Sequence, residues 1–195
     1  MTNEQGRILI VCTGNVCRSP YIERLLTVGM RGLDVGVSSA GTRALAGKPM
    51  DQGSARLLKD AGIGTDDFVA RQLTPAMLAE ADLVLTATRE HRREVVQLEP
   101  KALRYTHAVD DFSDLVAAAD LRNASFLESQ GAPMIAKLAS RAQSARGEVA
   151  ARVAEDSGIV DPFRQPDSVF MLMAQQVGEV LPRIVRAAHE VAVSC

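Results

Sequence analysis

The fold depends on the stretch Val11-Cys12-Thr13-Gly14-Asn15-Val16-Cys17-Arg18-Ser19-Pro20. The apolar run 8–11 that leads into it is typical of a buried strand in a parallel sheet. Apolar residues at positions 22, 25 and 26 follow it at helical spacing. Cys12 therefore lies where a strand ends and a short loop enters a helix. The unpaired N–H groups and the positive dipole end of such a helix favour a bound anion.

Two residues of this loop predict cleavage of a phosphate ester. In the field of a helix N-terminus the thiolate form of Cys12 is stabilised, which makes it a candidate nucleophile. Arg18 follows six residues later, and a guanidinium there can bind two oxygens of a tetrahedral oxyanion. The alternatives are an inert buried thiol and an ordinary surface arginine. Their occurrence together in one short loop favours the catalytic interpretation.

The other loop residues are expected to shape a phosphate-binding loop. Gly14 permits a tight or left-handed turn, and Asn15 tolerates that conformation and can brace the loop with its amide. Ser19 can donate its hydroxyl to the thiolate, and Pro20 fits the first helical turn. The predicted phosphate-binding loop comprises Thr13, Gly14, Asn15, Val16, Cys17 and Ser19.

The order Cys12-X5-Arg18-Ser19-Pro20 near the N-terminus resembles the signature loop of the low-molecular-weight protein tyrosine phosphatase family, which also has the Asn and the second Cys at these positions. The second signature of that family is an Asp-Pro pair followed by an aromatic residue near the C-terminus, and Asp161-Pro162-Phe163 is similar to it. The segments 38–42 and 82–86 also fit. The likeness covers roughly residues 6–116 and 159–193.

The resemblance implies roles for several distant residues. Asp161 would be the general acid that protonates the leaving phenolate and then activates water. The alternative interpretation is that Asp161 only shapes a turn. Phe163 would stack on the substrate ring as one wall of the cleft, and Leu45 would form the opposite wall. Cys17 would form a reversible disulfide with Cys12 under oxidant, or would simply pack in the core. Arg164 stands where many relatives have a second aromatic residue, which predicts a preference for acidic residues beside the phosphotyrosine.

The predicted activity is hydrolysis of phosphotyrosine in proteins through a phosphocysteine intermediate, with no metal or other cofactor. One alternative is an arsenate reductase of the same fold that uses an external thiol, although such enzymes commonly have Gln where Pro20 stands. Another alternative is a protein arginine phosphatase. Such enzymes resemble this chain but have Thr at the position of Val16. The aliphatic side chain of Val16 favours a substrate with an aryl group. A non-enzymatic phosphate-binding module is least favoured, because every catalytic residue type is present.

Composition excludes other functional classes. The chain has 195 residues, 47% of them apolar and 24% charged, with a net charge of −2, which predicts a single domain over 1–195 and no nucleic-acid or membrane partner. A polar start without a signal-peptide core and an odd count of three cysteines predict a cytoplasmic protein. Scattered histidines (His91, His107 and His189) disfavour a zinc site. The expected partner is a phosphotyrosine-containing protein, with a tyrosine kinase as one candidate, and the chain is expected to be a monomer or a weak dimer.

Alternating strands and helices predict an α/β fold, a three-layer α/β/α arrangement with a central four-stranded parallel sheet. Strands are expected at 7–11, 35–40, 82–87 and 105–109, and the main helices at 20–30, 51–61, 75–80, 88–98 and 166–192. Residues 117–157 depart from the family pattern and are predicted to be an extra helical insertion.

Three local expectations concern the surface of this fold. The insertion is expected to contain one long helix over 134–155, either packed as a hairpin on the edge of the fold or used as a partner surface. Asp110-Asp111 is expected to cap a helix, and His91, Arg92 and Arg93 are expected to be solvated helix positions.

Overall fold

The computed structural model describes residues 5–123, 128, 131–150, 152–153 and 157–194. Within them, strands pair in parallel in the order β2-β1-β3-β4, which places β1 inside the sheet and confirms the predicted four-stranded parallel sheet. The strands are β1 (Gly6–Cys12), β2 (Val35–Gly41), β3 (Leu83–Thr86) and β4 (Thr106–Ala108).

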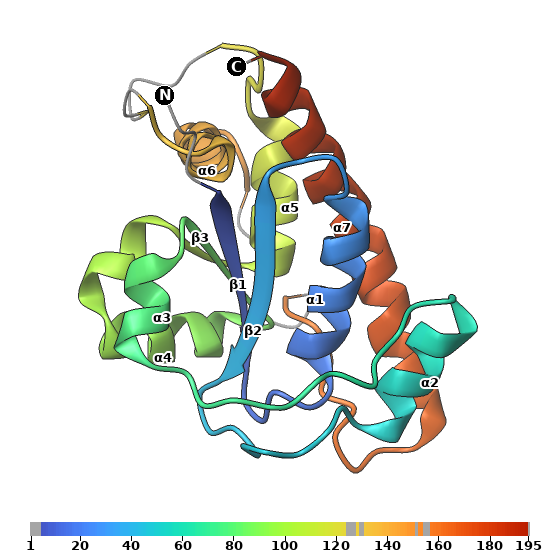
Figure 1. Cartoon of the computed structure of the whole chain (residues 1–195). Coiled ribbons are helices and arrows are strands. Elements are labelled where there is room, and N and C mark those ends of the chain that lie inside the picture. The colour runs from blue at the N-terminus through green and yellow to red at the C-terminus, as the bar shows by residue number, and fades with distance from the viewer. Residues whose placement is uncertain (1–4, 124–127, 129–130, 151, 154–156, 195) are drawn as a thin grey trace.

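Helices cover both faces of the sheet, so the predicted three-layer arrangement is confirmed (Figure 1). One face carries α1 (Arg18–Gly29), α5 (Val109–Ala118) and α7 (Asp167–Ser194), with α2 (Gln52–Asp60) packed against α1 and α7. The other face carries α3 (Pro75–Glu80) and α4 (Arg89–Leu98), and α4 is followed by the 3-10 helix η1 (Pro100–Arg104). None of the described helices is both long enough and apolar enough to cross a membrane.

The alternation of side chains along β1 builds two hydrophobic cores. Ile8 and Ile10 belong to the larger core beneath α1, α5 and α7, while Leu9 and Val11 belong to the smaller core beneath α3 and α4. All four are buried, as expected for a strand of a parallel sheet that is covered on both faces.

The helix predicted over 134–155 is shorter than expected. The structure has α6 (Met134–Ser144) and then one 3-10 turn, η2 (Ala145–Gly147), after which residues 148–150 are irregular. Gly147 has a low helix propensity, which accounts for the end of the helical segment. The rest of the predicted helix lies partly outside the described residues.

The inserted helix α6 is part of the main core. Ile135 and Leu138 are fully buried within the larger hydrophobic cluster, and α6 packs on α5, α7 and β1. A Cβ atom on Gly6 would lie 3.1 Å from the Ile135 side chain, so α6 covers the amino end of β1 closely (Figure 1). The expectation of a hairpin on the edge of the fold is therefore wrong for α6.

Side-chain caps begin two of the predicted helices. Asp51 accepts a hydrogen bond from the backbone N–H of Gly53 at the start of α2, and Thr88 caps α4. Asp110 and Asp111 do not cap a helix, because β4 runs directly into α5, which begins at residue 109. Both carboxylates lie in the first turn of α5, where the helix dipole favours negative charge.

Candidate active site

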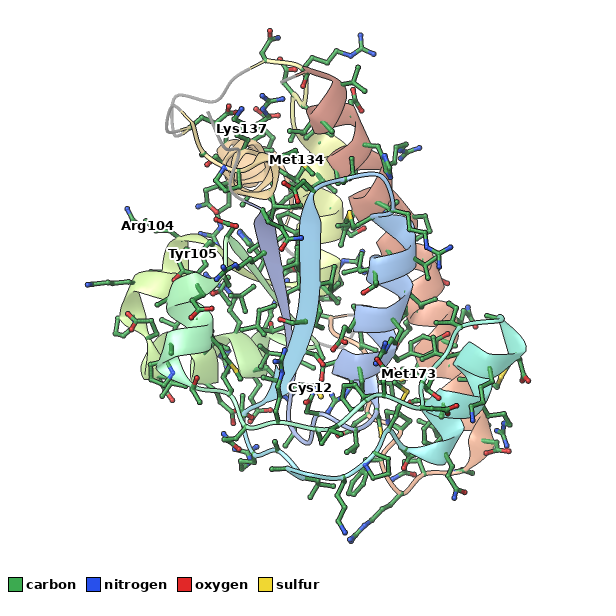
Figure 2. All side chains as sticks on the ribbon, in the orientation of Figure 1. Cys12, Arg104, Tyr105, Met134, Lys137 and Met173 are labelled. Atoms are coloured by element: carbon green, nitrogen blue, oxygen red, sulfur yellow. The ribbon has the colours of Figure 1, made fainter. Side chains whose placement is uncertain are left out.

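Cys12 ends β1 at the carboxyl edge of the sheet, and a five-residue loop connects it to Arg18, the first residue of α1 (Figure 2). Asn15, and not Gly14, adopts the left-handed conformation in this loop, with φ of 55°. The buried Asn15 amide donates to Ser19 Oγ (2.9 Å) and Ser39 Oγ (2.8 Å), and it accepts from the backbone N–H of Arg71 (2.9 Å). These three contacts hold the strained turn in place.

The loop lies directly against the end of β2. A Cβ atom on Gly41 would lie 2.4 Å from the carbonyl oxygen of Thr13, so a glycine is required at this position. The backbone N–H of Thr42 also donates to the carbonyl oxygen of Cys12 at 2.9 Å. The neighbouring strand thus fixes the path of the loop as it leaves the sheet.

A buried hydrogen-bond network leads away from the thiol. Cys12 Sγ lies 3.0 Å from Ser19 Oγ, and because the Ser19 hydroxyl accepts from Asn15, its own proton is available to the sulfur. On the other side of Asn15, Ser39 donates to Glu23 Oε2 at 2.5 Å. Burial raises the pKa of Glu23. The network therefore connects the thiol, through three hydrogen-bonded side chains, to the carboxyl group of Glu23 on α1.

Arg18 and Asp161 meet at the far end of the loop, although 143 positions separate them. The Arg18 guanidinium donates to Asp161 Oδ2 at 2.6 Å, and its Nε has no hydrogen-bond partner. Arg18 is 5% exposed, while the Asp161 side chain is about half exposed at 51%. The guanidinium is thus fixed within the protein, and the carboxylate can reach both the guanidinium and solvent.

These groups line one pocket with a volume of about 180 Å³. Phe163 and Leu45 lie at its rim, as the resemblance implies, and the buried Val16 lies within it. Asn15 and Ser19 are buried and do not line it. Its full lining is Cys12, Thr13, Gly14, Val16, Cys17, Arg18, Arg43, Leu45, Asp161 and Phe163.

The second cysteine of the loop is also buried and free. Burial, followed by the charge of Asp51, raises the pKa of Cys17 far above its ordinary value. Cys17 is therefore a neutral thiol at physiological pH. Both Cys12 and Cys17 line the same pocket.

Two arginines lie in or beside the pocket. Arg43, which sequence analysis did not single out, lines the pocket and forms an ion pair with Glu94 at 2.7 Å. Arg164 has φ of 60°, and its guanidinium lies over the Phe163 ring, 5.2 Å from the ring centroid. The cation–π contact holds the positive charge of Arg164 beside the aromatic wall.

His91 supports the loop, and sequence analysis wrongly placed it in solvent. It is 5% exposed, and its ring bridges Thr88 Oγ1 (2.7 Å) and Thr13 Oγ1 (2.8 Å). Burial and then the charge of Arg18 lower the pKa of His91 to about 4, so the imidazole is neutral near pH 7. Its sequence neighbours are all charged, which gave no signal that this position faces the loop.

The chain that carries Asp161 is anchored at three points. Gly158 N–H donates to Asp110 Oδ2 (2.6 Å), Ile159 N–H donates to the carbonyl oxygen of Ala87 (2.8 Å), and Val160 N–H donates to Gln176 Oε1 (2.8 Å). Asp110 is 2% exposed, so its carboxylate serves as a buried anchor on α5. These contacts bring a segment near the C-terminus over the loop that follows β1.

Among the described residues, no cluster of three or more His, Cys, Asp or Glu side chains has the arrangement of a metal site.

Comparison with known proteins finds a family match for the part of the chain that carries the Cys12 loop. Residues 7–128 match the family described as low molecular weight phosphotyrosine protein phosphatase. The chain is 39% identical over 94 residues to the low molecular weight protein-tyrosine-phosphatase Etp of Escherichia coli K12. That alignment covers 48% of this chain and 62% of Etp, so the chain matches less than two thirds of the length of this relative.

Solved structures share the fold over nearly the whole chain. Wzb of Vibrio vulnificus, in complex with benzylphosphonate, superposes with a TM-score of 0.66 at 24% identity, covering 93% of this chain and 97% of Wzb. The YwlE arginine phosphatase of Geobacillus stearothermophilus gives a TM-score of 0.66 at 25% identity, covering 93% and 91%. The family match includes the loop between Cys12 and Arg18 and extends over more than half of the sequence. The chain therefore belongs to the low molecular weight phosphotyrosine protein phosphatase family.

Proposed function

We propose that this protein hydrolyses phosphotyrosine in proteins, with Cys12 as the nucleophile. The observation that carries the proposal is the convergence of the Cys12 thiol, the Arg18 guanidinium and the Asp161 carboxyl group on one pocket. Apolar side chains, Val16, Leu45 and Phe163, supply other parts of its lining, and they suit an aromatic ring.

In the first step, the Cys12 thiolate attacks phosphorus in line with the bond to the tyrosine oxygen. The S–P bond forms as the P–O bond breaks, and Asp161 gives its proton to the departing phenolate. Arg18 and the loop N–H groups stabilise the charge on the equatorial oxygens. The Ser19 hydroxyl, 3.0 Å from the sulfur, stabilises the thiolate before attack and the sulfur leaving group afterwards.

In the second step, Asp161 is a carboxylate and accepts a proton from water. The resulting hydroxide attacks phosphorus, the S–P bond breaks, and inorganic phosphate and the Cys12 thiolate are released. Asp161 thus regains the proton that it gave up, and the cycle balances without a metal ion or an electron carrier.

Two variants test the mechanism, one that removes the nucleophile and one that removes the general acid. Cys12→Ser is expected to abolish release of phosphate from a phosphotyrosine peptide. Asp161→Asn is expected to lower kcat by about 10²–10⁴-fold for a phosphotyrosine peptide. The loss should be much smaller for an aryl phosphate whose leaving group is acidic enough to depart without a proton.

The matched control for the acid is Asp66→Asn, which changes an exposed carboxylate that is paired with Lys59 and is not part of the pocket lining. Equal losses by Asp161→Asn on the two leaving groups would contradict the assignment of Asp161 as general acid. Turnover by Cys12→Ser would contradict the nucleophile.

A protein arginine phosphatase is the second candidate, because the YwlE arginine phosphatase shares this fold at 25% identity. Val16 within the pocket favours the aryl substrate, since the resemblance places Thr at that position in arginine phosphatases. Phosphotyrosine and phosphoarginine peptides of one sequence, with arsenate and a thiol as a third assay, distinguish the two candidates and the arsenate reductase. A higher kcat/KM for phosphoarginine would overturn the proposal.

The partner proposed for this site is a phosphotyrosine-containing protein in the cytoplasm, with a tyrosine kinase as one candidate. The curated relative Etp is named a protein-tyrosine-phosphatase, which supports the substrate class. Arg43 and Arg164 at the rim support a preference for acidic residues beside the phosphotyrosine. Arg164→Ala is expected to reduce the preference for acidic over neutral flanking residues in a peptide panel.

A further inference from the structure

A second cavity, of about 320 Å³, lies between α4, β4, α5 and the turn η2. It shares no lining residue with the pocket that contains Cys12. The cationic residues Arg89, Arg92, Arg93 and Arg146 line it together with Asp111 and Asp114. Two of its walls come from helices of the common fold, and one comes from the inserted segment that follows α6.

Other residues already neutralise the two carboxylates of this cavity. Asp111 accepts two hydrogen bonds from Arg89, at 2.8 and 2.6 Å. Asp114 accepts from Arg152 at 2.6 and 2.9 Å, and from Arg183 at 3.2 Å. The arginine charge of the cavity therefore exceeds the carboxylate charge, although the charge of Asp111 still acts to raise the pKa of Arg92 against the lowering by burial.

Three guanidinium groups carry this uncompensated charge. Arg93 and Arg146 are exposed and form no hydrogen bond or ion pair within the described part of the chain. Arg92 donates its Nε–H to the carbonyl oxygen of Thr106 at 2.7 Å. Burial and then the charge of Arg146 lower the pKa of Arg92, which shows that these cations repel one another. A bound anion would relieve that repulsion.

His107 provides an independent indication of a ligand. It is 2% exposed, it is one of the residues that line the cavity, and its Nε2 atom has no hydrogen-bond partner. Burial, then Arg146 and Arg92, lower the pKa of His107 to about 3, so the ring is neutral near pH 7 and carries one N–H group. With its N–H on Nε2, the ring would donate to a ligand oxygen and so offset the cost of a buried polar atom without a partner.

We propose that this cavity binds a small organic phosphate with an apolar body. Arginine forks match two phosphate oxygens at once, and a doubly charged head group balances three free guanidinium groups better than a carboxylate does. The apolar part of the ligand would contact Leu115 and Val149, which also line the cavity. The volume is in the range of pockets that bind small molecules.

The two helices that form the cavity also support the catalytic loop and the Asp161 segment. α4 carries His91, which bonds to Thr13, and α5 carries Asp110, which holds Gly158. A ligand between α4 and α5 therefore acts on kcat through both helices. This effect on kcat rests on the proposed function, whereas binding itself does not.

The probe for the test is para-fluorophenyl phosphonate, which is not hydrolysed and is followed by fluorine NMR on the full-length protein. Vanadate is added to occupy the pocket at Cys12. We expect a bound signal that vanadate does not displace. The double variant R93Q/R146Q is expected to weaken the binding behind that signal by at least about tenfold, which corresponds to roughly 1.4 kcal/mol. R31Q, a change at another exposed arginine, should leave it unchanged.

His107→Phe tests the unpartnered nitrogen while keeping a ring against Phe112, whose centroid lies 5.1 Å from that of His107. It should weaken the vanadate-resistant binding by several-fold, with a thermal unfolding curve that confirms a folded protein. Absence of that signal in wild type, or equal affinity in R93Q/R146Q, would overturn the site.

The proposed effect of the ligand on catalysis is tested separately, by measuring kcat. Saturating the vanadate-resistant site, as judged by fluorine NMR, should change kcat for a phosphotyrosine peptide, which is not a small organic phosphate, in the wild type but not in R93Q/R146Q. An unchanged kcat in both proteins would overturn the effect on catalysis. Failure of the proposed phosphatase function would appear as absent turnover in every sample, with the binding measurement still intact.

Discussion

Both ends of β1 are buried, but polar side chains pack around the carboxyl end and apolar side chains pack around the amino end. At the carboxyl end, Asn15 and Ser19 are fully buried, and their polar atoms are hydrogen-bonded to one another and to Cys12. At the amino end, Gly6 lies beneath Ile135 of α6. Figure 2 shows this separation, with Cys12 at one end of the sheet and Met134 and Lys137 of α6 at the other.

The two ends of β1 are therefore expected to contribute differently to activity and to the stability of the fold. Buried polar groups contribute little net free energy even when every hydrogen bond is made, whereas buried apolar side chains stabilise the fold in proportion to their area. Changes to the residues that line the pocket at the carboxyl end should therefore reduce activity more than stability. Changes at the amino end should do the reverse.

The largest effect is expected for Arg18→Lys at the carboxyl end. Lysine keeps the charge but loses the two-pronged contact, so kcat/KM for an aryl phosphate should fall by about 10²–10³-fold. The melting temperature should change little. Arg31→Lys is the control at an exposed site on the same region of chain. A destabilised Arg18→Lys protein with normal kcat/KM would contradict the separation.

Ile135→Ala tests the amino end. The side chain is fully buried, so its truncation should lower the free energy of unfolding by about 2–5 kcal/mol, measured by urea denaturation. The value of kcat well below the melting temperature should stay at the wild-type level. Lys137→Ala, a change to a partly exposed neighbour on the same helix, should cost much less stability. A large loss of kcat in Ile135→Ala would mean that the two ends are coupled.

Lowering the pH should reduce the stability of the protein through protonation of the buried His91 imidazole at the carboxyl end. The pKa of His91 is near 4 in the folded protein and 6.5 in the unfolded chain, so the unfolded chain binds the proton first. Stability is therefore lost as pH falls from 6.5 toward 4, by about 2 kcal/mol between pH 7 and pH 5 for His91 alone. His91→Gln keeps one donor and one acceptor and should reduce this pH dependence. The remaining slope should come from His107, whose pKa is also lowered.

The smallest effect is expected for Ser39→Ala, at the end of β2. It breaks the network between Asn15 and Glu23 without touching the pocket. The expected cost is about 1–3 kcal/mol of stability, with kcat lowered by less than about tenfold. A loss of kcat as large as that of Arg18→Lys would show that the carboxyl group of Glu23 takes part in the chemistry.

The sequence was sufficient to predict the parts of the fold that depend on local pattern. The alternation of strands and helices predicted the four-stranded sheet, and the helices predicted at 51–61 and 88–98 begin within one residue of the starts of α2 and α4. The convergence of residues near Cys12 with Asp161 came from the family resemblance, since no local pattern relates two positions so far apart.

Other features depend on tertiary contacts that a local pattern does not contain. His91 lies among charged residues on α4, and only the packing of α4 against the loop shows that it is buried. Alanine-rich composition predicted a long helix over 134–155 but not its end at Ser144 or its place in the core. The anchoring role of Asp110 depends on a backbone group 48 positions away.

The ion pair between Arg18 and Asp161 has a consequence for ligand affinity. Any incoming oxyanion competes for the guanidinium with a carboxylate tethered to the same chain, which behaves as an inhibitor at a fixed, high effective concentration. Singly charged anions are thus at a disadvantage against dianions in this pocket.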